Sequence, residues 1–438
     1  MKFPEGFLWG TATSAHQVEG DNTNNNWYAW ENTPGKIINN EKAGKASDWW
    51  GGRWKEDLSN AHKDGQNVHH FSIEWSRIQP RLDKWDESAL DFYRGILRWM
   101  KEHNMLPIIT IHHFSDPLWV YEQGGWANDT TPQYFEQFVQ KALPALMEFC
   151  NVWITTNEPN VLVVNSYVDG SFPPGIQNLV VAARAEKNLV RGHAKAYHAI
   201  HALQKDAKVA YSVHYRGMFP KNPYSRMDRY ITNMLSGVFN DTFGNTLVDG
   251  NFRFLFYKTF LKEAIDTQDY IALQYYSADE VSFAPHKPAQ LFAERRYPPQ
   301  AALSENNFIA NVPSGFRQAI EWAGRFGLPI YITENGIDDS KDELRPMYTL
   351  EHIYEVWRAI QEGYDIRSYI HWSQVDNFEW ERGWSQRFGL YDLDIKTQKR
   401  TRRPSADMYA QICKKNALSK QTVNTFAPNL VESLFKEK

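Results

Sequence analysis

Two short segments of the chain each end in a glutamate at the point where a strand should stop. Residues 152–156 and 330–333 are β-branched, aromatic and Thr residues of strand character, in runs too short for a helix. Glu158 follows the first run, between Asn157 and Pro159, and Glu334 follows the second, just before Asn335-Gly336. Asn, Pro and Gly residues of this kind end a strand. Either glutamate alone could be an ordinary surface residue. Together they predict two carboxylates that point from strand ends into a cleft walled by loops.

Paired carboxylates of this kind are suited to the cleavage of glycosidic bonds. Retention of configuration needs one ionised carboxylate for attack and one protonated carboxyl group for the leaving oxygen, roughly 5 Å apart. Hydrogen-bond donors should keep the pKa of the first low. A less polar setting or a nearby negative charge should keep the second protonated near neutral pH.

The elements that must position these residues are predicted from an alternation of strand-like and helical patterns. Eight strands separated by helical patterns indicate a parallel sheet with crossover helices, and hence a single (β/α)₈ TIM barrel over residues 1–438. Its long loops after the strands should form the active-site cleft, because barrel sites lie at the C-terminal strand ends. The predicted strands are 7–12, 66–73, 106–111, 152–156, 208–213, 271–274, 330–333 and 366–372.

Apolar spacings of three and four residues predict the helices. They are expected at 53–63, 87–103, from 131 onward, 180–205, 315–326, 350–362 and 405–413. Asp86 and Ser314 are expected N-caps. The range 219–260 is expected to be helical with irregular joins, 277–312 to be a long loop, and 414–438 to be a polar tail that packs loosely against the barrel bottom.

The polar and aromatic residues near the strand ends should form one coherent site. They combine acids, amides, imidazoles and indoles, which suit a polyhydroxylated ring with apolar faces. The 17 Trp residues are more than a core needs, although some must be core. The predicted set is Gln17, Glu19, His69, His70, His113, Asn157, Glu158, Tyr276, Glu334, Trp372, Glu379 and Trp380.

Composition argues against several other classes. A formal net charge of −4 does not indicate a nucleic-acid or anionic-membrane partner, and no apolar run is long enough to span a bilayer. The two cysteines form neither a disulfide framework nor a metal pattern, and no leader is recognisable, so we expect a cytoplasmic protein. Adjacent histidines in a strand point to opposite faces, so His69–His70 and His112–His113 are not expected to chelate one ion. We expect no metal and no cofactor, and the oligomeric state stays open, with a homo-oligomer as one alternative.

Five groups of residues resemble glycoside hydrolase family one, the retaining β-glycosidases that include β-glucosidases. They occur in family order over most of the chain, and the ordered set is far more specific than any one group. The matching runs are 7–15 with 17–20, 71–78, 156–159, 333–336, and 376–380 with 387–390.

The resemblance implies a role for each site residue. Glu334 would be the nucleophile, Glu158 the acid/base, and Tyr276 a hydrogen-bond donor to the nucleophile. Asn157 would hold the 2-hydroxyl group of the sugar, and Trp372 would form the floor beneath the ring. The remaining hydroxyl groups of the non-reducing sugar would be bound by Gln17, His113, Glu379 and Trp380.

Four positions depart from the family pattern. His70 stands where the family usually has Arg close to the nucleophile, so a permanent charge becomes titratable. We therefore expect the pKa of Glu334 to be less depressed and activity to depend more on pH near 6–7. The alternative is that another Arg or Lys fills that space. The other departures are Gln274 for Asn, Phe114 for Trp and Trp384 for Tyr.

The sequence thus predicts a retaining exo-acting β-glycosidase for terminal β-D-glucosides, with tolerance for β-D-galactosides and β-D-fucosides. Transglycosylation is open to any enzyme with this mechanism. The alternatives are a sugar-binding barrel with impaired catalysis, a 6-phospho-β-glycosidase, and a metal-dependent barrel hydrolase. Glu379-Trp380 favours an unphosphorylated sugar. The aglycone is not specified, because its walls would come from variable loops at about 22–50, 164–178 and 277–312.

Overall fold

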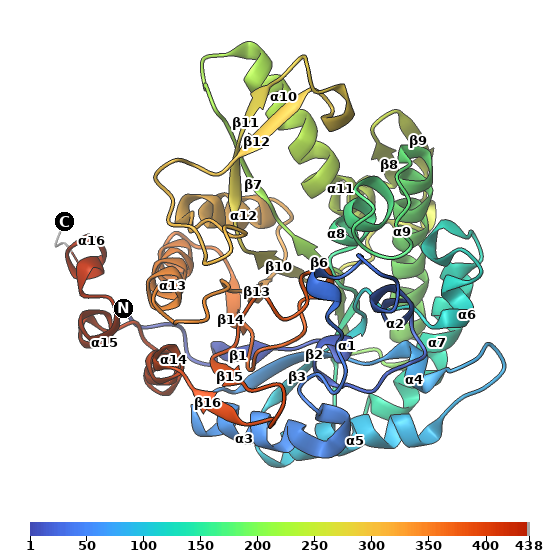
Figure 1. The fold of residues 1–438 in the computed structure, drawn as a ribbon, viewed down its shortest axis with the longest axis horizontal. Coiled ribbons are helices and arrows are strands. Elements are labelled where there is room, and N and C mark those ends of the chain that lie inside the picture. The colour runs from blue at the N-terminus through green and yellow to red at the C-terminus, as the bar shows by residue number, and fades with distance from the viewer. Residues whose placement is uncertain (436–438) are drawn as a thin grey trace.

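The computed structural model describes residues 1–435 and is built around one parallel sheet (Figure 1). Its strand order is β5-β4-β3-β2-β1-β14-β13-β10-β6. The strands are β1 (Leu8–Ala12), β2 (Val68–Ser72), β3 (Leu106–His112), β4 (Val152–Thr156), β5 (Lys208–Ala210), β6 (Ser212–His214), β10 (Ile271–Tyr275), β13 (Ile330–Asn335) and β14 (Ile366–Trp372).

The two strands at the ends of this order, β5 and β6, are separated in the chain only by Tyr211. They are therefore two halves of the predicted fifth strand. One half pairs with β4 and the other with β10, so the sheet closes on itself through this break. The predicted (β/α)₈ barrel is confirmed, and its eight strands lie within two residues of their predicted bounds.

The predicted helices cover the outside of the barrel. They are α3 (Trp54–Lys63), α5 (Glu87–Glu102), α7 (Thr131–Leu146), α9 (Leu179–Leu203), α12 (Pro313–Gly324), α13 (Arg345–Gln361) and α14 (Pro404–Lys415). Asp86 caps α5 as predicted, because its carboxylate accepts a hydrogen bond from the backbone N–H of Ser88. The predicted cap at Ser314 is wrong. Helix α12 begins at Pro313, whose fixed φ suits the first helical turn.

Shorter elements connect the barrel units. They are α1 (Ala15–Val18), α2 (Asn26–Glu31), α4 (Trp75–Ile78), α6 (Leu118–Tyr121), α8 (Pro159–Val163), β15 (Tyr391–Leu393) and β16 (Arg400–Arg402), together with π- or 3₁₀-turns at Ile38–Asn40, Trp49–Arg53, Gly125–Ala127, Val164–Val168, Lys262–Ala264, Pro288–Gln290 and Trp380–Arg382.

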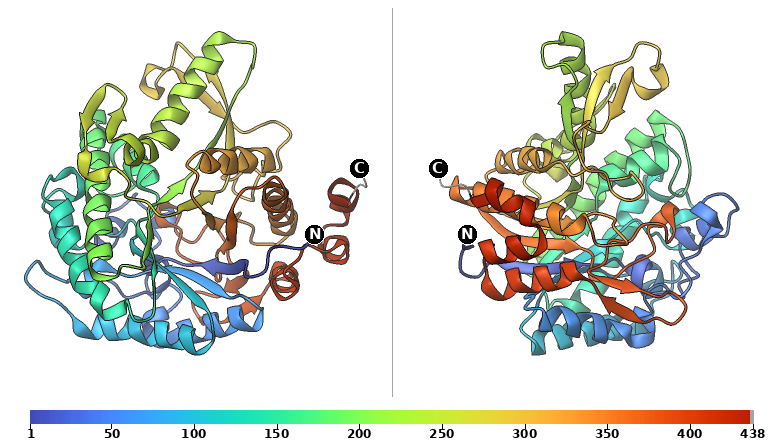
Figure 2. Two further views of the ribbon diagram at one scale, coloured as in Figure 1. Left: turned by 180° about the vertical axis from the view of Figure 1, so that it is seen from behind. Right: turned by 60° about the vertical axis from the view of Figure 1, so that its left-hand side comes forward.

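Two predicted irregular regions contain strands that the sequence did not reveal. The range 219–260 holds α10 (Arg226–Ser236), a π-turn (Gly237–Asp241) and α11 (Thr242–Asp249), as expected, and then a hairpin of β8 (Asn251–Phe254) and β9 (Tyr257–Phe260). The expected loop 277–312 contains β11 (Ala278–Phe283) and β12 (Ala293–Arg296), which form a three-stranded sheet with β7 (Gly217–Pro220). Together with α10 this small sheet projects away from the barrel (Figures 1 and 2). Its pairing joins segments about 60 residues apart, so local patterns could not predict it.

Alternate residues along the strands divide between two apolar layers. Val68, Ile108 and Ile154 belong to the smaller cluster, whereas Phe71, Ile109 and Trp153 belong to the larger one. This alternation is what a packed barrel requires, with one set of side chains filling its interior and the other lying beneath the helices. Six of the 17 Trp residues are among the largest fully buried side chains, so much of the Trp excess is core.

The C-terminal segment differs from the predicted loose, polar tail. It forms α15 (Lys420–Phe426), a 3₁₀-turn (Pro428–Leu430) and α16 (Val431–Phe435), and it buries Val423, Leu430 and Leu434. These helices lie beside α14, close to the N-terminus (Figures 1 and 2). The part of the predicted tail at 436–438 lies outside the described residues.

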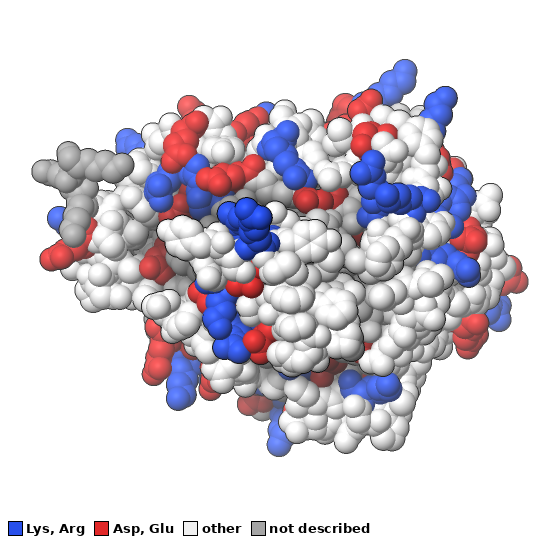
Figure 3. Space-filling model, turned by 90° about the horizontal axis from the view of Figure 1, so that it is seen from above, with Lys and Arg blue, Asp and Glu red and all other residues white. Residues whose placement is uncertain are grey.

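The surface carries both signs of charge. On the face shown in Figure 3, acidic and basic side chains are interspersed. Within residues 1–435, no helix combines the length and the apolar character that a bilayer crossing requires.

Candidate active site

Seven of the predicted site residues line one cavity of about 130 Å³ at the C-terminal strand ends. They are His113, Glu158, Tyr276, Glu334, Trp372, Glu379 and Trp380. Three more of the predicted residues lie directly behind this lining, where each contacts or approaches one of the seven. His70 approaches Glu334, Asn157 bonds to His113, and Gln17 bonds to Glu379.

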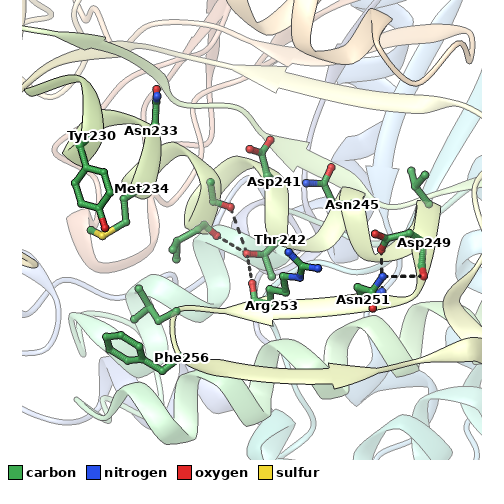
Figure 4. A pocket seen from close by; sticks show the side chains of 14 residues that line it. Tyr230, Asn233, Met234, Asp241, Thr242, Asn245, Asp249, Asn251, Arg253 and Phe256 are labelled. Carbon is green, nitrogen blue, oxygen red and sulfur yellow. Dashed lines mark hydrogen bonds between the residues drawn. The ribbon is translucent and has the colours of Figure 1, made fainter. Parts of the chain in front are cut away.

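A larger cavity of about 510 Å³ lies outside the barrel, between α10, α11 and the β8–β9 hairpin (Figure 4). Tyr230 and Phe256 flank it, with Asp241 just before α11 and Asn245 and Asp249 along that helix. None of the predicted site residues lines this cavity. Size alone therefore does not identify the candidate site, whereas the paired acids do.

Glu334 lies near the end of β13, where the backbone makes an unusually close approach to its neighbour. A Cβ atom on Gly336 would lie 2.0 Å from the carbonyl oxygen of Trp372, so only glycine fits here. The hydroxyl of Tyr276 donates to Oε2 of Glu334 across 2.6 Å. Among the described residues, Oε1 of Glu334 has no hydrogen-bond partner.

Burial raises the pKa of Glu334 well above its usual range, and the negative charge of Glu158 acts in the same direction. The hydrogen bond from Tyr276 opposes this rise, as expected of a donor to the charged form, but does not cancel it. The pKa of Glu334 is therefore not depressed, in the direction expected from the missing arginine, although the donor Tyr276 was expected to keep it low. The two carboxyl groups disfavour being ionised together, so the pair tends to hold one proton, as two-carboxylate chemistry requires.

His70 lies beside Glu334 without carrying the charge that was expected there. Its Nδ1 is 3.7 Å from Oε1 of Glu334, and its Nε2 is 2.7 Å from Oγ1 of Thr110. Burial lowers the pKa of His70 to about 4, so the ring is neutral at pH 6–7. The expectation that His70 titrates near neutral pH is wrong. It took the pKa of free imidazole as its starting point, whereas the barrel interior excludes water and disfavours the charged ring. The alternative, that another Arg or Lys fills the space of the family's arginine beside Glu334, is not supported either. No cation is among the main influences on the pKa of Glu334.

Glu158 caps the short helix α8 and adopts left-handed backbone angles, with φ 38° and ψ 58°. This conformation is unfavourable for a non-glycine residue, so the surroundings must hold it. The backbone N–H of Glu158 donates to Ser212 at the start of β6. Its Oε1 lies 2.9 Å from Nδ1 of His214, at the end of the same strand.

Asn157 connects three strand ends. Its Nδ2 lies 3.0 Å from Nε2 of His113, while its Oδ1 accepts from Ser212 across 2.7 Å and from Gln274 across 2.8 Å. The longer Gln274 side chain thus keeps an amide contact here. This network fixes the orientation of His113 at the cavity wall.

At the opposite end of the cavity, Glu379 is held by two amides. Its Oε2 accepts from Gln17 across 3.0 Å and from Asn377 across 2.9 Å. Burial raises the pKa of Glu379 to about 8. The amide of Gln17 is also bonded to Ser14 and to the backbone of Phe378, so in this structure it positions Glu379.

Aromatic rings form the walls around these polar groups. The ring of His113 stacks 5.9 Å from that of Trp380 and 6.1 Å from that of Trp372. Both indoles line the cavity. They provide flat apolar surfaces of the kind that a sugar ring can cover.

Two residues of the larger predicted set do not join the site. Glu19 accepts from Arg77 across 2.7 Å and from Tyr93 across 2.6 Å, as a buried structural acid. His69 contacts the hydroxyl groups of Thr11 and Thr13, on the side of its strand opposite to His70. No cluster of three or more potential metal-ligating side chains occurs in the described part of the chain.

Sequence reasoning missed several lining residues. His214 directly follows the predicted fifth strand, the one strand end for which no residue was named, so its position was a usable signal. Phe172 and Phe308 come from two of the three loops expected to form the outer wall. Arg216, Glu381 and Arg382 also line the cavity, and no local pattern distinguished them.

Comparisons with known proteins agree with this geometry. The model of glycosyl hydrolase family 1 matches residues 1–418. Beta-glucosidase A of Thermotoga maritima is 34% identical over 449 residues, covering 95% of this chain and 99% of that protein. A beta-galactosidase of Sulfolobus acidocaldarius is 26% identical, covering 96% and 97%.

Solved structures show the same arrangement. A beta-glycosidase from Pyrococcus horikoshii has a TM-score of 0.90 at 32% identity, with 97% of this chain and 98% of that chain covered. A beta-glucosidase from Thermotoga maritima in complex with glucoimidazole has a TM-score of 0.90 at 30% identity, with 95% and 100% covered. On the family match, the full-length relatives and the shared barrel, this chain belongs to glycosyl hydrolase family 1 and is a glycoside hydrolase.

Proposed function

We propose that the protein is a retaining, exo-acting β-glycosidase of terminal non-reducing β-D-glucosides that also accepts β-D-galactosides and β-D-fucosides. The main support is that Glu158 and Glu334 line one small cavity, each with its own polar contact, from His214 and Tyr276 respectively. The relatives named beta-glucosidase and beta-galactosidase support the substrate class.

In the proposed reaction, the shared proton resides on Glu158 when substrate is bound. The Tyr276 hydroxyl favours this distribution, because its hydrogen bond stabilises the ionised form of Glu334. Glu334 attacks the anomeric carbon while Glu158 donates its proton to the leaving oxygen, which gives a covalent glycosyl-enzyme. The ester no longer carries the charge of Glu334, so Glu158 holds its proton less strongly and acts as base for the incoming water. A second sugar in place of water would give transglycosylation.

The sugar is held at the other end of the cavity. Glu379 offers acceptors for hydroxyl groups, His113 a ring nitrogen, and Trp372 and Trp380 flat apolar faces. A second acid, Glu381, lines the same cavity. Glu379 and Trp380 stand where a phosphate-binding set would be expected, which makes the 6-phospho-β-glycosidase alternative weaker.

A panel of p-nitrophenyl β-glycosides tests this proposal. The glucoside, galactoside and fucoside should all release p-nitrophenol, whereas the 6-phosphoglucoside should not. ¹H NMR during glucoside hydrolysis should show the β-anomer of the product first, since two inversions restore the configuration. First appearance of the α-anomer would contradict retention.

Replacement of the proposed nucleophile tests its role. Glu334→Ala should lower kcat by about four orders of magnitude or more, because the covalent step is lost. Azide should restore activity toward an activated aryl glucoside and give the α-glucosyl azide, since one inversion remains. Glu343→Ala, at an exposed position, is the matched control and should remain active. Ordinary hydrolysis by Glu334→Ala would show that another group attacks.

A further inference from the structure

His214 lies at the end of β6, in direct contact with the proposed acid/base residue. Its Nδ1 is 2.9 Å from Oε1 of Glu158. The imidazole is stacked on Tyr276, with 5.4 Å between ring centroids and 20° between ring planes. Its backbone carbonyl accepts a hydrogen bond from Asn160 across 2.8 Å. The residue is therefore held at its backbone by Asn160 and on one ring face by Tyr276, beside the proposed acid.

The two oxygens of Glu158 have different surroundings. Oε1 faces His214, whereas Oε2 has no hydrogen-bond partner among residues 1–435. A carboxylic acid carries one proton, and its location decides what the acid can do. A proton on Oε1 would point at the imidazole, but a proton on Oε2 is free for a ligand in the cavity.

We propose that His214 is a positioning residue for acid catalysis: its Nδ1–H donates to Oε1 of Glu158 and so directs the acidic proton to Oε2, toward the leaving oxygen. This inference rests on the proposed function, because it assumes that Glu158 is the acid. His214 itself touches neither of the bonds that change.

The proton follows one route through both steps. In the first, the bond from C1 to Glu334 forms, the bond from C1 to the leaving oxygen breaks, and the proton on Oε2 of Glu158 moves to that oxygen. In the second, water forms its bond to C1, the ester bond to Glu334 breaks, and a water proton returns to Oε2. His214 keeps its Nδ1 proton throughout, so the acid regains its proton at the productive oxygen.

The titratable and charged groups that face His214 come from several elements. Glu158 and Tyr276 face the imidazole directly, and Glu334 lies beyond Tyr276. The π-turn Gly237–Asp241 presents only the ring of Phe239, 6.1 Å away. Arg216, two residues along the chain, is held in an ion pair with Asp279 at 2.7 Å.

Two substitutions separate hydrogen bonding from packing. In His214→Asn, the amide Nδ2 occupies the place of the imidazole Nδ1, two bonds from Cβ, and can still donate to Glu158. In His214→Phe, an aromatic ring remains to stack on Tyr276 but the donor is lost. The control is His198→Asn, at an exposed histidine on α9.

The readout is kcat/KM for β-glucosides whose leaving groups differ in acidity. His214→Phe should lose about tenfold toward methyl or alkyl glucosides, the effect of losing one hydrogen bond to a reacting acid. Toward 2,4-dinitrophenyl glucoside, which leaves without protonation, it should stay near wild type. The alkaline limb of its pH profile should also move to higher pH, because a donor to the ionised form is gone. His214→Asn should restore most of the lost activity, and His198→Asn should match wild type.

Three results would overturn the inference while leaving the proposed function intact. One is an equal loss by His214→Phe toward both classes of glucoside, which would indicate a packing role. Another is no loss toward either class. The third is faster cleavage of alkyl glucosides by His214→Phe, which would mean that Glu158 donates to His214. Failure of the wild type to cleave any β-glycoside of the panel would instead contradict the proposed function itself.

Discussion

At the scale of single residues, the environment of each carboxyl group matters more than its identity. Glu158, Glu334 and Glu379 share one cavity, and burial raises the pKa of Glu334 and of Glu379. Tyr276 opposes this rise at Glu334 alone. One short hydrogen bond thus favours ionisation at the proposed nucleophile.

Removing that hydrogen bond should be measurable. Tyr276→Phe deletes the donor 2.6 Å from Oε2 of Glu334, so the pKa of Glu334 should rise further. Activity requires ionised Glu334, and the acidic limb of the kcat/KM profile should therefore move to higher pH. At the wild-type optimum, we expect a loss of about tenfold. Tyr224→Phe, at an exposed tyrosine, is the control, and an unmoved acidic limb in Tyr276→Phe would contradict the assignment.

The neutral state of His70 leads to a second pH prediction. Burial holds its pKa at about 4, so its charge does not change between pH 6 and 7. His70→Gln can keep the hydrogen bond to Thr110 and adds no charge. The acidic limb of its kcat/KM profile against pH should coincide with that of the wild-type protein. If wild-type activity falls between pH 7 and 6 and His70→Gln abolishes that fall, His70 titrates there after all.

At the scale of elements, the site depends on how closely neighbouring strand ends approach one another. The connection after β13 passes against the end of β14, where Gly336 meets the backbone of Trp372. The fifth barrel strand breaks into β5 and β6 at Tyr211, and the second half carries Ser212 and His214 to Glu158, the proposed acid/base residue. Small backbone shifts at these points would move both proposed catalytic residues.

Gly336→Ala tests the first of these approaches. Its Cβ would lie 2.0 Å from a backbone oxygen that cannot swing away, so the strand ends must separate. We expect a loss of about 2–3 kcal/mol in the free energy of unfolding, together with reduced kcat, measured by chemical denaturation and by assay. Gly95→Ala, with open space around its Cβ in the middle of α5, should instead stabilise by about 0.5–1 kcal/mol. A Gly336→Ala protein as stable and active as wild type would show that the strands can move apart freely.

At the scale of the whole molecule, the two ends of the chain support each other. Asn416 caps α14 in a left-handed conformation. Its Oδ1 accepts from the indole of Trp9 in β1 across 2.8 Å, and its Nδ2 donates to the carbonyl oxygens of Phe3 and Pro4. This one side chain therefore fixes the first barrel strand to the last barrel helix.

Asn416→Ala should weaken the whole barrel. It leaves the buried indole N–H of Trp9 unpaired and puts alanine in a left-handed position, which together should cost about 3 kcal/mol. Thermal unfolding followed by circular dichroism would measure the change. Asn429→Ala, at a peripheral asparagine near α16, is the control. Equal stability of the two variants would contradict this role for the chain ends.

Local patterns were sufficient for much of the barrel. Strands such as 152–156 and 366–372 match their predicted bounds, because their β-branched and aromatic runs are bounded by turn residues. The small sheet of β7, β11 and β12 was missed, since its strands are short and one partner lies far away in the sequence. The C-terminal helices were missed because their apolar residues are few and scattered.

The sequence by itself determined the eight-strand alternation and the strand ends at which the proposed functional groups gather, and it singled out the two proposed catalytic carboxylates, because these follow from local periodicity and residue order. Only the tertiary structure decided the electrostatics. It buries His70 and makes it neutral, it raises the pKa of Glu334 despite Tyr276, and it places His214 against Glu158. These properties depend on dielectric surroundings and on contacts between distant segments, which a linear sequence does not specify.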